Sequence, residues 1–257
     1  MIRLGVCTDI RNAEAIAELG YDYVESALNA VARMTEAEFS EAKSHIAASG
    51  LACEAMNCML PADVRVVGPN VQAQQIHDYL DLAFGRAVQL GAKLVVFGSG
   101  KSRNVPEGFD YPQAWRQLAN YLRMVERHAR DHRLIVAVEP LRRAECNIVN
   151  FVSEAVALTS LVNMPHVGVL GDTYHMGMGS EPIEALARAG ELLCHVHVAN
   201  PIGRAFPKPK DGEDYARLFR VLEEAGYPGR ISIEAKTENL LEDARTSFRL
   251  LDDMRRA

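Results

Sequence analysis

Short apolar runs rich in β-branched residues alternate along the chain with longer runs of helical periodicity. Eight of the short runs have the composition of strands: Ile2–Cys7, Tyr21–Glu25, Ala52–Asn57, Leu94–Phe97, Leu134–Glu139, Val167–Asp172, His195–Ala199 and Arg230–Glu234. The segments after them predict eight helices, near residues 11–19, 36–49, 72–90, 112–132, 153–163, 181–189, 213–225 and 239–256. Strands that alternate with helices in this way are typical of a parallel sheet built from βα units.

The number of βα units predicts an α/β protein that closes into a single (β/α)8 TIM barrel, with residues 1–257 as one domain. Such a barrel usually takes about 250 residues, close to the length of this chain. The main alternative is a doubly wound open sheet. That fold would place a glycine-rich phosphate loop after the first strand, where this chain has Cys7–Ile10. We therefore expect the closed barrel.

Glycine and proline support the predicted element boundaries. Four glycines lie where a helix should end and a strand begin, which suits a left-handed cap: Gly20, Gly50, Gly91 and Gly226. Ser180 followed by Pro182 predicts the start of a helix, with serine as the cap and proline in the first turn.

Four of the predicted strands carry a potential metal ligand at or near their C-terminal ends: Glu139, Asp172, His197 and Glu234. In a barrel these strand ends converge on one rim. Three acids and an imidazole are rarely buried at one level without a shared partner. The set contains no cysteine, so it predicts a divalent metal ion, Mn²⁺ before Mg²⁺ or Co²⁺, rather than structural Zn²⁺. The alternative is four unrelated residues held by helix N-termini and backbone amides.

Further polar residues in the loops after the strands are candidates for substrate binding. Glu145 could hold a substrate hydroxyl, and His175 could bind a substrate oxygen or relay a proton. Arg204 and Lys208 could bind a hydroxyl, a carboxylate or a phosphate. Each of them has an alternative interpretation as a solvated or packed loop residue. Weaker candidates are Glu54, Asn57 and Arg103.

The strand that carries His197 also carries a second histidine, His195. We expect only one of the two to face the barrel interior and the other to face the helices. The strand pattern leaves open which of them faces inward.

The overall composition narrows the range of partners. The formal net charge is −6 and the basic residues are scattered, which gives no electrostatic footprint for nucleic acid or an anionic membrane. No apolar run approaches the roughly 20 residues that span a bilayer, and the N-terminus begins with a strand pattern rather than a signal peptide. The five cysteines are expected to be reduced and mostly buried. We expect a cytoplasmic protein with a small-molecule partner, and neither nucleic acid nor a membrane.

Four motifs in sequence order resemble those of a known family: Val138–Pro140, Gly171–His175, His195–Asn200 and Ile233–Glu234. They are similar to motifs of the sugar isomerase/epimerase superfamily of xylose-isomerase-like barrels, which includes ketose 3-epimerases, hydroxypyruvate isomerase, inosose dehydratase and endonuclease IV. The resemblance implies that the metal ligands are Glu139, Asp172, His197 and Glu234. It also implies that Glu139 and Glu234 form the catalytic acid/base pair, that Glu145 and His175 bind substrate, and that the protein forms dimers or tetramers.

The loop after the seventh predicted strand departs from the ketose 3-epimerase pattern. Those enzymes have an arginine where this chain has Gly203, and Arg204 follows one position later. The Gly-Arg pair resembles hydroxypyruvate isomerases instead. Endonuclease IV has additional zinc-binding residues where this chain reads Lys208–Glu213. A DNA-repair enzyme is therefore disfavoured, and the substrate class stays open.

We expect a metal-dependent sugar isomerase or epimerase that moves a proton next to a carbonyl through an enediolate, on a ketose or a related small hydroxy-keto compound. A free sugar or hydroxy-keto acid is favoured over a phosphorylated one, because Ala235–Asn239 is not a glycine-rich phosphate loop. One alternative is a lyase of the inosose-dehydratase type, which would expel a hydroxyl group from the same intermediate. Another is a carbohydrate-binding barrel without catalysis.

Overall fold

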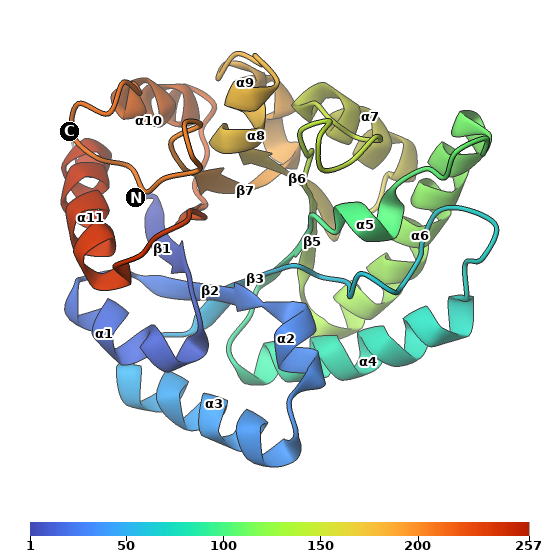
Figure 1. Cartoon of the computed structure of the whole chain (residues 1–257), viewed down its shortest axis with the longest axis horizontal. Coiled ribbons are helices and arrows are strands. Elements are labelled where there is room, and N and C mark those ends of the chain that lie inside the picture. The colour runs from blue at the N-terminus through green and yellow to red at the C-terminus, as the bar shows by residue number, and fades with distance from the viewer. Residues whose placement is uncertain (257) are drawn as a thin grey trace.

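The computed structural model describes residues 1–256, in which eight parallel strands form a closed barrel in sequence order (Figure 1). The strands are β1 (Arg3–Cys7), β2 (Tyr23–Ala27), β3 (Cys53–Asn57), β4 (Leu94–Phe97), β5 (Ile135–Val138), β6 (Val167–Asp172), β7 (Leu193–Val198) and β8 (Arg230–Ile233). The barrel closes where β8 pairs with β1, with Arg3 opposite Arg230. The predicted (β/α)8 TIM barrel is confirmed.

Helices surround the barrel, and the last of them lies beside β1 and the first helix, so the two ends of the chain meet (Figure 1). The helices at the predicted places are α1 (Ala13–Glu18), α3 (Glu36–Ser49), α4 (Ala73–Gln89), α6 (Tyr111–His132), α7 (Val152–Val162), α9 (Ala185–Ala189), α10 (Tyr215–Glu224) and α11 (Leu240–Arg256). Within residues 1–256, no helix combines the length and the apolar character needed to cross a membrane.

Short helical segments outside the predicted helices are α2 (Leu28–Arg33), α5 (Gly100–Arg103), α8 (Thr173–Met178) and η2 (Gly190–Leu192), whereas η1 (Ile10–Asn12) overlaps the start of the helix predicted near residues 11–19. The segment α8 explains why the predicted start of the next helix at Ser180 is wrong. Ser180 does not cap α9, because it lies in a left-handed turn (φ 53°) directly after α8, and Glu184 takes the cap position. The four predicted glycine boundaries do adopt positive φ angles of 98°, 70°, 93° and 65°.

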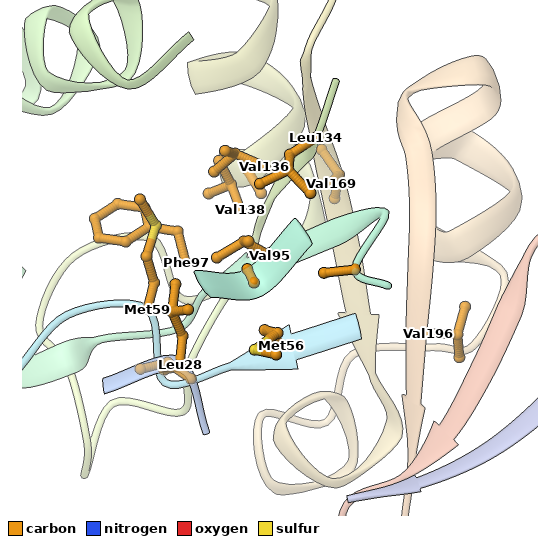
Figure 2. Packing of buried hydrophobic residues seen from close by; sticks show 14 of the residues in the cluster. Leu28, Met56, Met59, Val95, Phe97, Leu134, Val136, Val138, Val169 and Val196 are labelled. Carbon is orange, nitrogen blue, oxygen red and sulfur yellow. The ribbon is translucent and has the colours of Figure 1, made fainter. Parts of the chain in front are cut away.

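The outward-facing residues of the strands pack beneath the helices. Val95 and Phe97 of β4 and Val136 and Val138 of β5 belong to this large apolar core (Figure 2). Because both faces of a parallel sheet are covered, its strands are near-continuous apolar runs, which explains why the sequence showed them so clearly.

The inward-facing residues form a smaller cluster inside the barrel: Tyr23, Ala55, Leu94, Val96, Ala137 and Leu170. Gly5 makes room for the largest of them, since a Cβ atom on Gly5 would lie 2.3 Å from the Tyr23 ring. Residues two apart in a strand share a face. The register that points Tyr23, Ala137 and Leu170 inward therefore also points the polar residue two positions later into the C-terminal mouth of the barrel.

Candidate active site and metal centre

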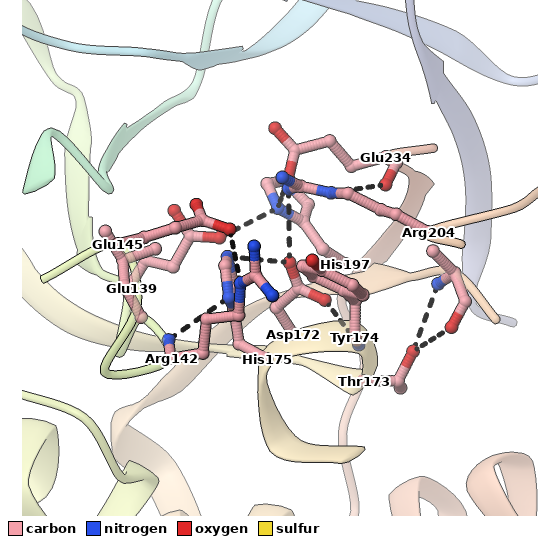
Figure 3. A network of polar contacts seen from close by, with 12 residues as sticks. Glu139, Arg142, Glu145, Asp172, Thr173, Tyr174, His175, His197, Arg204 and Glu234 are labelled. Atoms are coloured by element: carbon pink, nitrogen blue, oxygen red, sulfur yellow. Dashed lines mark hydrogen bonds and ion pairs between the residues drawn. The ribbon is translucent and has the colours of Figure 1, made fainter. Parts of the chain in front are cut away.

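The C-terminal mouth of the barrel holds four potential metal ligands from four consecutive strands (Figure 3). Glu139 follows β5, Asp172 ends β6, His197 lies in β7 and Glu234 follows β8. One ligand atom of each lies within 4.8 Å of the ligand atoms of the others. Asp172 and His197 are direct partners across the β6–β7 ladder. The structure therefore places the four residues in one cluster.

The geometry of this cluster fits a hard divalent cation. His197 Nδ1 lies 3.3 Å from Glu139 Oε1 and 3.3 Å from Glu234 Oε2. Asp172 Oδ1 accepts a hydrogen bond from the Tyr174 amide at 2.7 Å, whereas Asp172 Oδ2 is buried and accepts none. A buried oxygen without a partner is costly. A cation bound among the three carboxylates and the imidazole would satisfy that oxygen, and three oxygens with one nitrogen suit Mn²⁺ or Mg²⁺.

The carboxyl groups of the cluster differ in their electrostatic surroundings. Burial raises the pKa of Glu139 despite its hydrogen bond with His197. Burial, together with the charges of Glu139 and Glu234, raises the pKa of Asp172 well above its usual range. Burial also disfavours ionised Glu234, but His197 and Arg204 outweigh it and lower the pKa of Glu234 to about 2. A cation bound here would offset the repulsion between these closely spaced carboxylates.

Arg204 contacts two acids of the cluster, Glu234 and Asp172. Its guanidinium forms an ion pair with the Glu234 carboxylate and lies 3.7 Å from Asp172 Oδ2. It also lies over the Tyr174 ring, 4.8 Å from the ring centre. The Arg204 carbonyl accepts a hydrogen bond from the Lys236 amide at 2.7 Å. The loops after β7 and β8 are thus joined beside the site.

The two other predicted substrate-binding residues lie at different depths. His175 is buried; its Nδ1 accepts a hydrogen bond from the Arg142 amide at 3.2 Å, and its Nε2 lies 3.6 Å from Asp172 Oδ2. Burial, reinforced by Arg204, lowers the pKa of His175 to about 3, so the ring is neutral. Glu145 is half-exposed and accepts a hydrogen bond from Arg142 Nε at 2.7 Å. Lys208 is exposed and pairs with Asp243 at 2.8 Å, not with an acid of the cluster.

The weaker candidates for the pocket, Asn57, Arg103 and Glu54, lie in different places in the structure. Asn57 belongs to the site, because its Nδ2 donates to Glu234 Oε1 at 2.9 Å. Arg103 is buried and donates to the carbonyl groups of Phe97 and Glu139, which holds the ends of β4 and β5 together. The assignment of Glu54 to the pocket is wrong. Glu54 pairs with the first residues of β1 and β8, so it lies at the N-terminal end of the barrel.

Glu25 in β2 was not among the residues predicted for the site. Glu25 is fully buried, and its carboxylate bonds to His195 Nε2 at 2.9 Å and to His197 Nε2 at 3.0 Å. The expectation that only one of the two histidines faces inward is wrong, because residues two apart in a strand share a face. Both rings are buried inside the barrel with their centres 5.0 Å apart. The position of Glu25 at the end of a predicted strand was the available signal.

Comparison with known proteins gives the family. Residues 13–254 match the family described as the xylose isomerase-like TIM barrel. The chain belongs to this family. The expected relation to the sugar isomerase/epimerase superfamily is therefore confirmed.

Proteins similar to this chain in sequence include sugar epimerases. The D-psicose 3-epimerase of Agrobacterium fabrum is 25% identical over 229 residues, which cover 86% of this chain and 77% of that enzyme. The ketose 3-epimerase of Arthrobacter globiformis is 28% identical over 234 residues, covering 87% and 76% of the two chains. The 3-dehydro-D-guloside 4-epimerase of Escherichia coli strain K12 is 27% identical over 122 residues, and there the match spans 47% of this chain and only 46% of the relative.

A solved structure with the same fold is a D-psicose 3-epimerase crystallised in the presence of D-fructose. It superposes with a TM-score of 0.88 over the whole of both chains at 16% identity. The E. coli 3-keto-D-glucoside 4-epimerase superposes with a TM-score of 0.84 at 21% identity, over 98% of this chain and all of that one. At these identities the likeness concerns the fold.

Proposed function

We propose that this protein is a divalent-metal-dependent sugar isomerase or epimerase, and that it epimerises a ketose or a related small hydroxy-keto compound. The observation that carries the proposal is the pair of carboxylates that flank His197 Nδ1, Glu139 and Glu234, each at 3.3 Å. They come from β5 and β8, which β6 and β7 separate in the barrel. They therefore approach the centre of the mouth from different sides. The relatives named as ketose and psicose 3-epimerases support the reaction class.

The proposed metal ligands are Glu139, Asp172, His197 and Glu234, with Mn²⁺ preferred over Mg²⁺ or Co²⁺. When bound, such a cation supplies Lewis-acid polarisation of a carbonyl and stabilises negative charge that develops on its oxygen. Asp172 and His197 act only as ligands in this scheme.

Glu139 and Glu234 are the proposed acid/base pair. One carboxylate removes the proton from the carbon next to the carbonyl, and the other returns a proton to the opposite face. Because epimerisation runs in both directions, each of them has to act as acid and as base. Asn57 and Arg204 hold the Glu234 side chain through separate oxygens, Oε1 and Oε2. These contacts fix the direction from which Glu234 approaches the substrate.

The remaining polar groups are proposed to bind the substrate. Arg204 and Glu145 are more accessible than His175, with side chains 21% and 34% exposed. Arg204 would donate hydrogen bonds to sugar hydroxyls, and Glu145 would accept them. His175 presents a neutral ring whose Nδ1 already accepts the Arg142 amide. Its Nε2–H is therefore the group left to bind a substrate oxygen.

Exchange of solvent deuterium tests the proton transfer. The Mn²⁺-loaded protein is incubated in D₂O with free ketoses, ketose phosphates, hydroxypyruvate and inososes, and incorporation next to the carbonyl is followed by NMR. We expect exchange on at least one of them, and a loss of several orders of magnitude in the Glu234→Gln variant. Glu238→Gln is the matched control, because Glu238 is an exposed acid in the same loop after β8. If no compound exchanges a proton, the proposed function is wrong.

The products distinguish the proposed reaction from its alternatives. An epimerase returns a sugar with inverted configuration, whereas a lyase releases water and an unsaturated or deoxy product. A carbohydrate-binding protein without catalysis would bind sugar equally well after Glu234→Gln and would never exchange the proton.

A further inference from the structure

Glu25 is an anion buried in the middle of the barrel whose partners are two imidazole rings. Its Oε1 bonds to His197 Nε2 at 3.0 Å and its Oε2 to His195 Nε2 at 2.9 Å. In the part of the chain that the structure describes, no lysine or arginine pairs with it. A buried carboxylate is stable only when both oxygens receive strong hydrogen bonds. The two histidines therefore have to donate to it.

This requirement decides which ring nitrogens carry hydrogen. An ionised carboxylate can only accept, so Nε2 is protonated in both rings. His197 is then left with Nδ1, which faces Glu139 and Glu234 at 3.3 Å each. A cation binds the neutral ring, in which this nitrogen carries a lone pair; the hydrogen that Nδ1 shares with Glu139 without a cation would be released on binding.

His195 takes the second oxygen of Glu25 and connects it to a rigid part of the barrel. Ser232 Oγ lies 3.4 Å from His195 Nε2 and 2.8 Å from the Tyr23 hydroxyl. The Tyr23 ring fills the space left by Gly5. Glu25 is therefore linked through His195 and Ser232 to the packed Tyr23 ring.

We propose that Glu25 is a positioning residue for the metal centre: it orients the His197 ring and keeps its Nδ1 free to bind the cation. This inference rests on the proposed function, because it requires a cation among the four ligands. Histidine ligands of metals commonly donate their other ring nitrogen to a carboxylate, and loss of that carboxylate typically weakens metal affinity by about 10–100-fold.

Cys7 could suggest a second metal site here instead, since its sulfur lies within 4.8 Å of ligand atoms of Glu25 and His197. Both Glu25 oxygens, however, are occupied by imidazole nitrogens. Burial, together with the negative charge of Glu25, raises the pKa of the Cys7 thiol well above its usual value. The thiol stays protonated, and the group is a hydrogen-bond network beside the metal centre.

The substitution Glu25→Gln tests the inference because an amide has one accepting oxygen and one donating nitrogen. If its nitrogen faces His197, that ring has to place its own hydrogen on Nδ1, where the cation would bind. If its nitrogen faces His195, that ring has to place hydrogen on Nδ1, which is buried without a partner. The first orientation blocks the metal-binding nitrogen of His197, and the second leaves a buried N–H of His195 without a partner. Both therefore disfavour metal binding.

The experiment is a Mn²⁺ titration of chelator-treated, folded protein by calorimetry. We expect Glu25→Gln to weaken Mn²⁺ affinity by about 10–100-fold and Glu25→Asp, which keeps two accepting oxygens, to weaken it less. Glu54→Gln is the matched control, because Glu54 is a buried strand acid of the neighbouring β3 that pairs with Arg3 and Arg230 away from the site. It should leave the affinity unchanged.

A second measurement covers the case in which Glu25→Gln does not fold. In Mg²⁺-loaded wild-type protein labelled with ¹⁵N-histidine, NMR should show hydrogen on His197 Nε2 and none on Nδ1. Hydrogen on Nδ1, or a folded Glu25→Gln protein with wild-type affinity, overturns the inference. A wild-type protein that binds no divalent cation refutes the proposed function and this inference with it. Binding by the wild type with equal binding by Glu25→Gln refutes the inference alone.

Discussion

Gly98, the residue after β4, should control the position of the proposed catalytic acid Glu139. A Cβ atom at this position would lie 1.7 Å from Glu139 Oε2 and 2.9 Å from Glu139 Cδ. Its backbone is not in the left-handed region, so alanine introduces no conformational strain of its own. The substitution Gly98→Ala therefore acts through contact with the Glu139 carboxylate.

The size of the effect follows from the distances. Real Cβ contacts essentially never fall below 3.0 Å, so the carboxylate has to move by the difference from 1.7 Å, about 1.3 Å. A misplacement of about 1 Å in a catalytic group costs on the order of 100-fold in rate, or about 2.7 kcal/mol. The obstructed atom is the far end of a flexible side chain, which can rotate away. Stability should therefore change by less than about 1 kcal/mol.

The assay compares deuterium exchange rates and urea unfolding of the two proteins. We expect Gly98→Ala to lose about 100-fold in exchange rate with a nearly unchanged unfolding curve. Gly85→Ala is the matched control, because a Cβ atom on Gly85 in α4 has nothing within 4 Å. It should keep full activity and gain about 0.5–1 kcal/mol of stability from helix propensity. Wild-type exchange in Gly98→Ala would refute the assignment of Glu139 to the proton transfer.

Three further predictions concern stability. Arg103→Met removes the donors to the buried carbonyls of Phe97 and Glu139, so the free energy of unfolding in urea should fall by about 2–5 kcal/mol. An unchanged unfolding midpoint would contradict the role of Arg103 in holding the ends of β4 and β5 together. Chelator-treated protein should gain about 2.7 kcal/mol on addition of Mn²⁺ at 100 times its Kd, measured by thermal unfolding, and the absence of any gain would count against a cation site. Since the pKa of His175 is lowered to about 3 in the fold, the unfolded chain binds a proton first as the pH falls. As the pH falls from about 6 to about 4, the free energy of unfolding of chelator-treated wild type should therefore fall relative to that of His175→Asn by up to about 1.4 kcal/mol per pH unit. If the two proteins show parallel curves of unfolding free energy against pH, this linkage is excluded.

The fold was largely predictable because its signals are local. Each strand is buried on both faces, so it stands out as a short apolar run, and positive-φ glycines such as Gly50 mark the joints. The short helices were not predictable, because α2, α5 and α8 have four to six residues and are too short for a helical period. The same applies to the start of α9, where a turn after α8 displaced the expected cap.

For the site, the sequence by itself determined which residues stand at the C-terminal ends of strands, because that position follows from the strand and its parallel direction. Glu139, Asp172 and Glu234 were visible for this reason. The tertiary structure alone decided which side chains meet across the barrel. Glu25 of β2 reaches His195 and His197 of β7 over a sequence separation of at least 170 residues. β2 and β7 are not neighbours in the sheet, and their side chains meet only because the sheet closes into a barrel. No local sequence pattern encodes which residues of distant strands face each other across it.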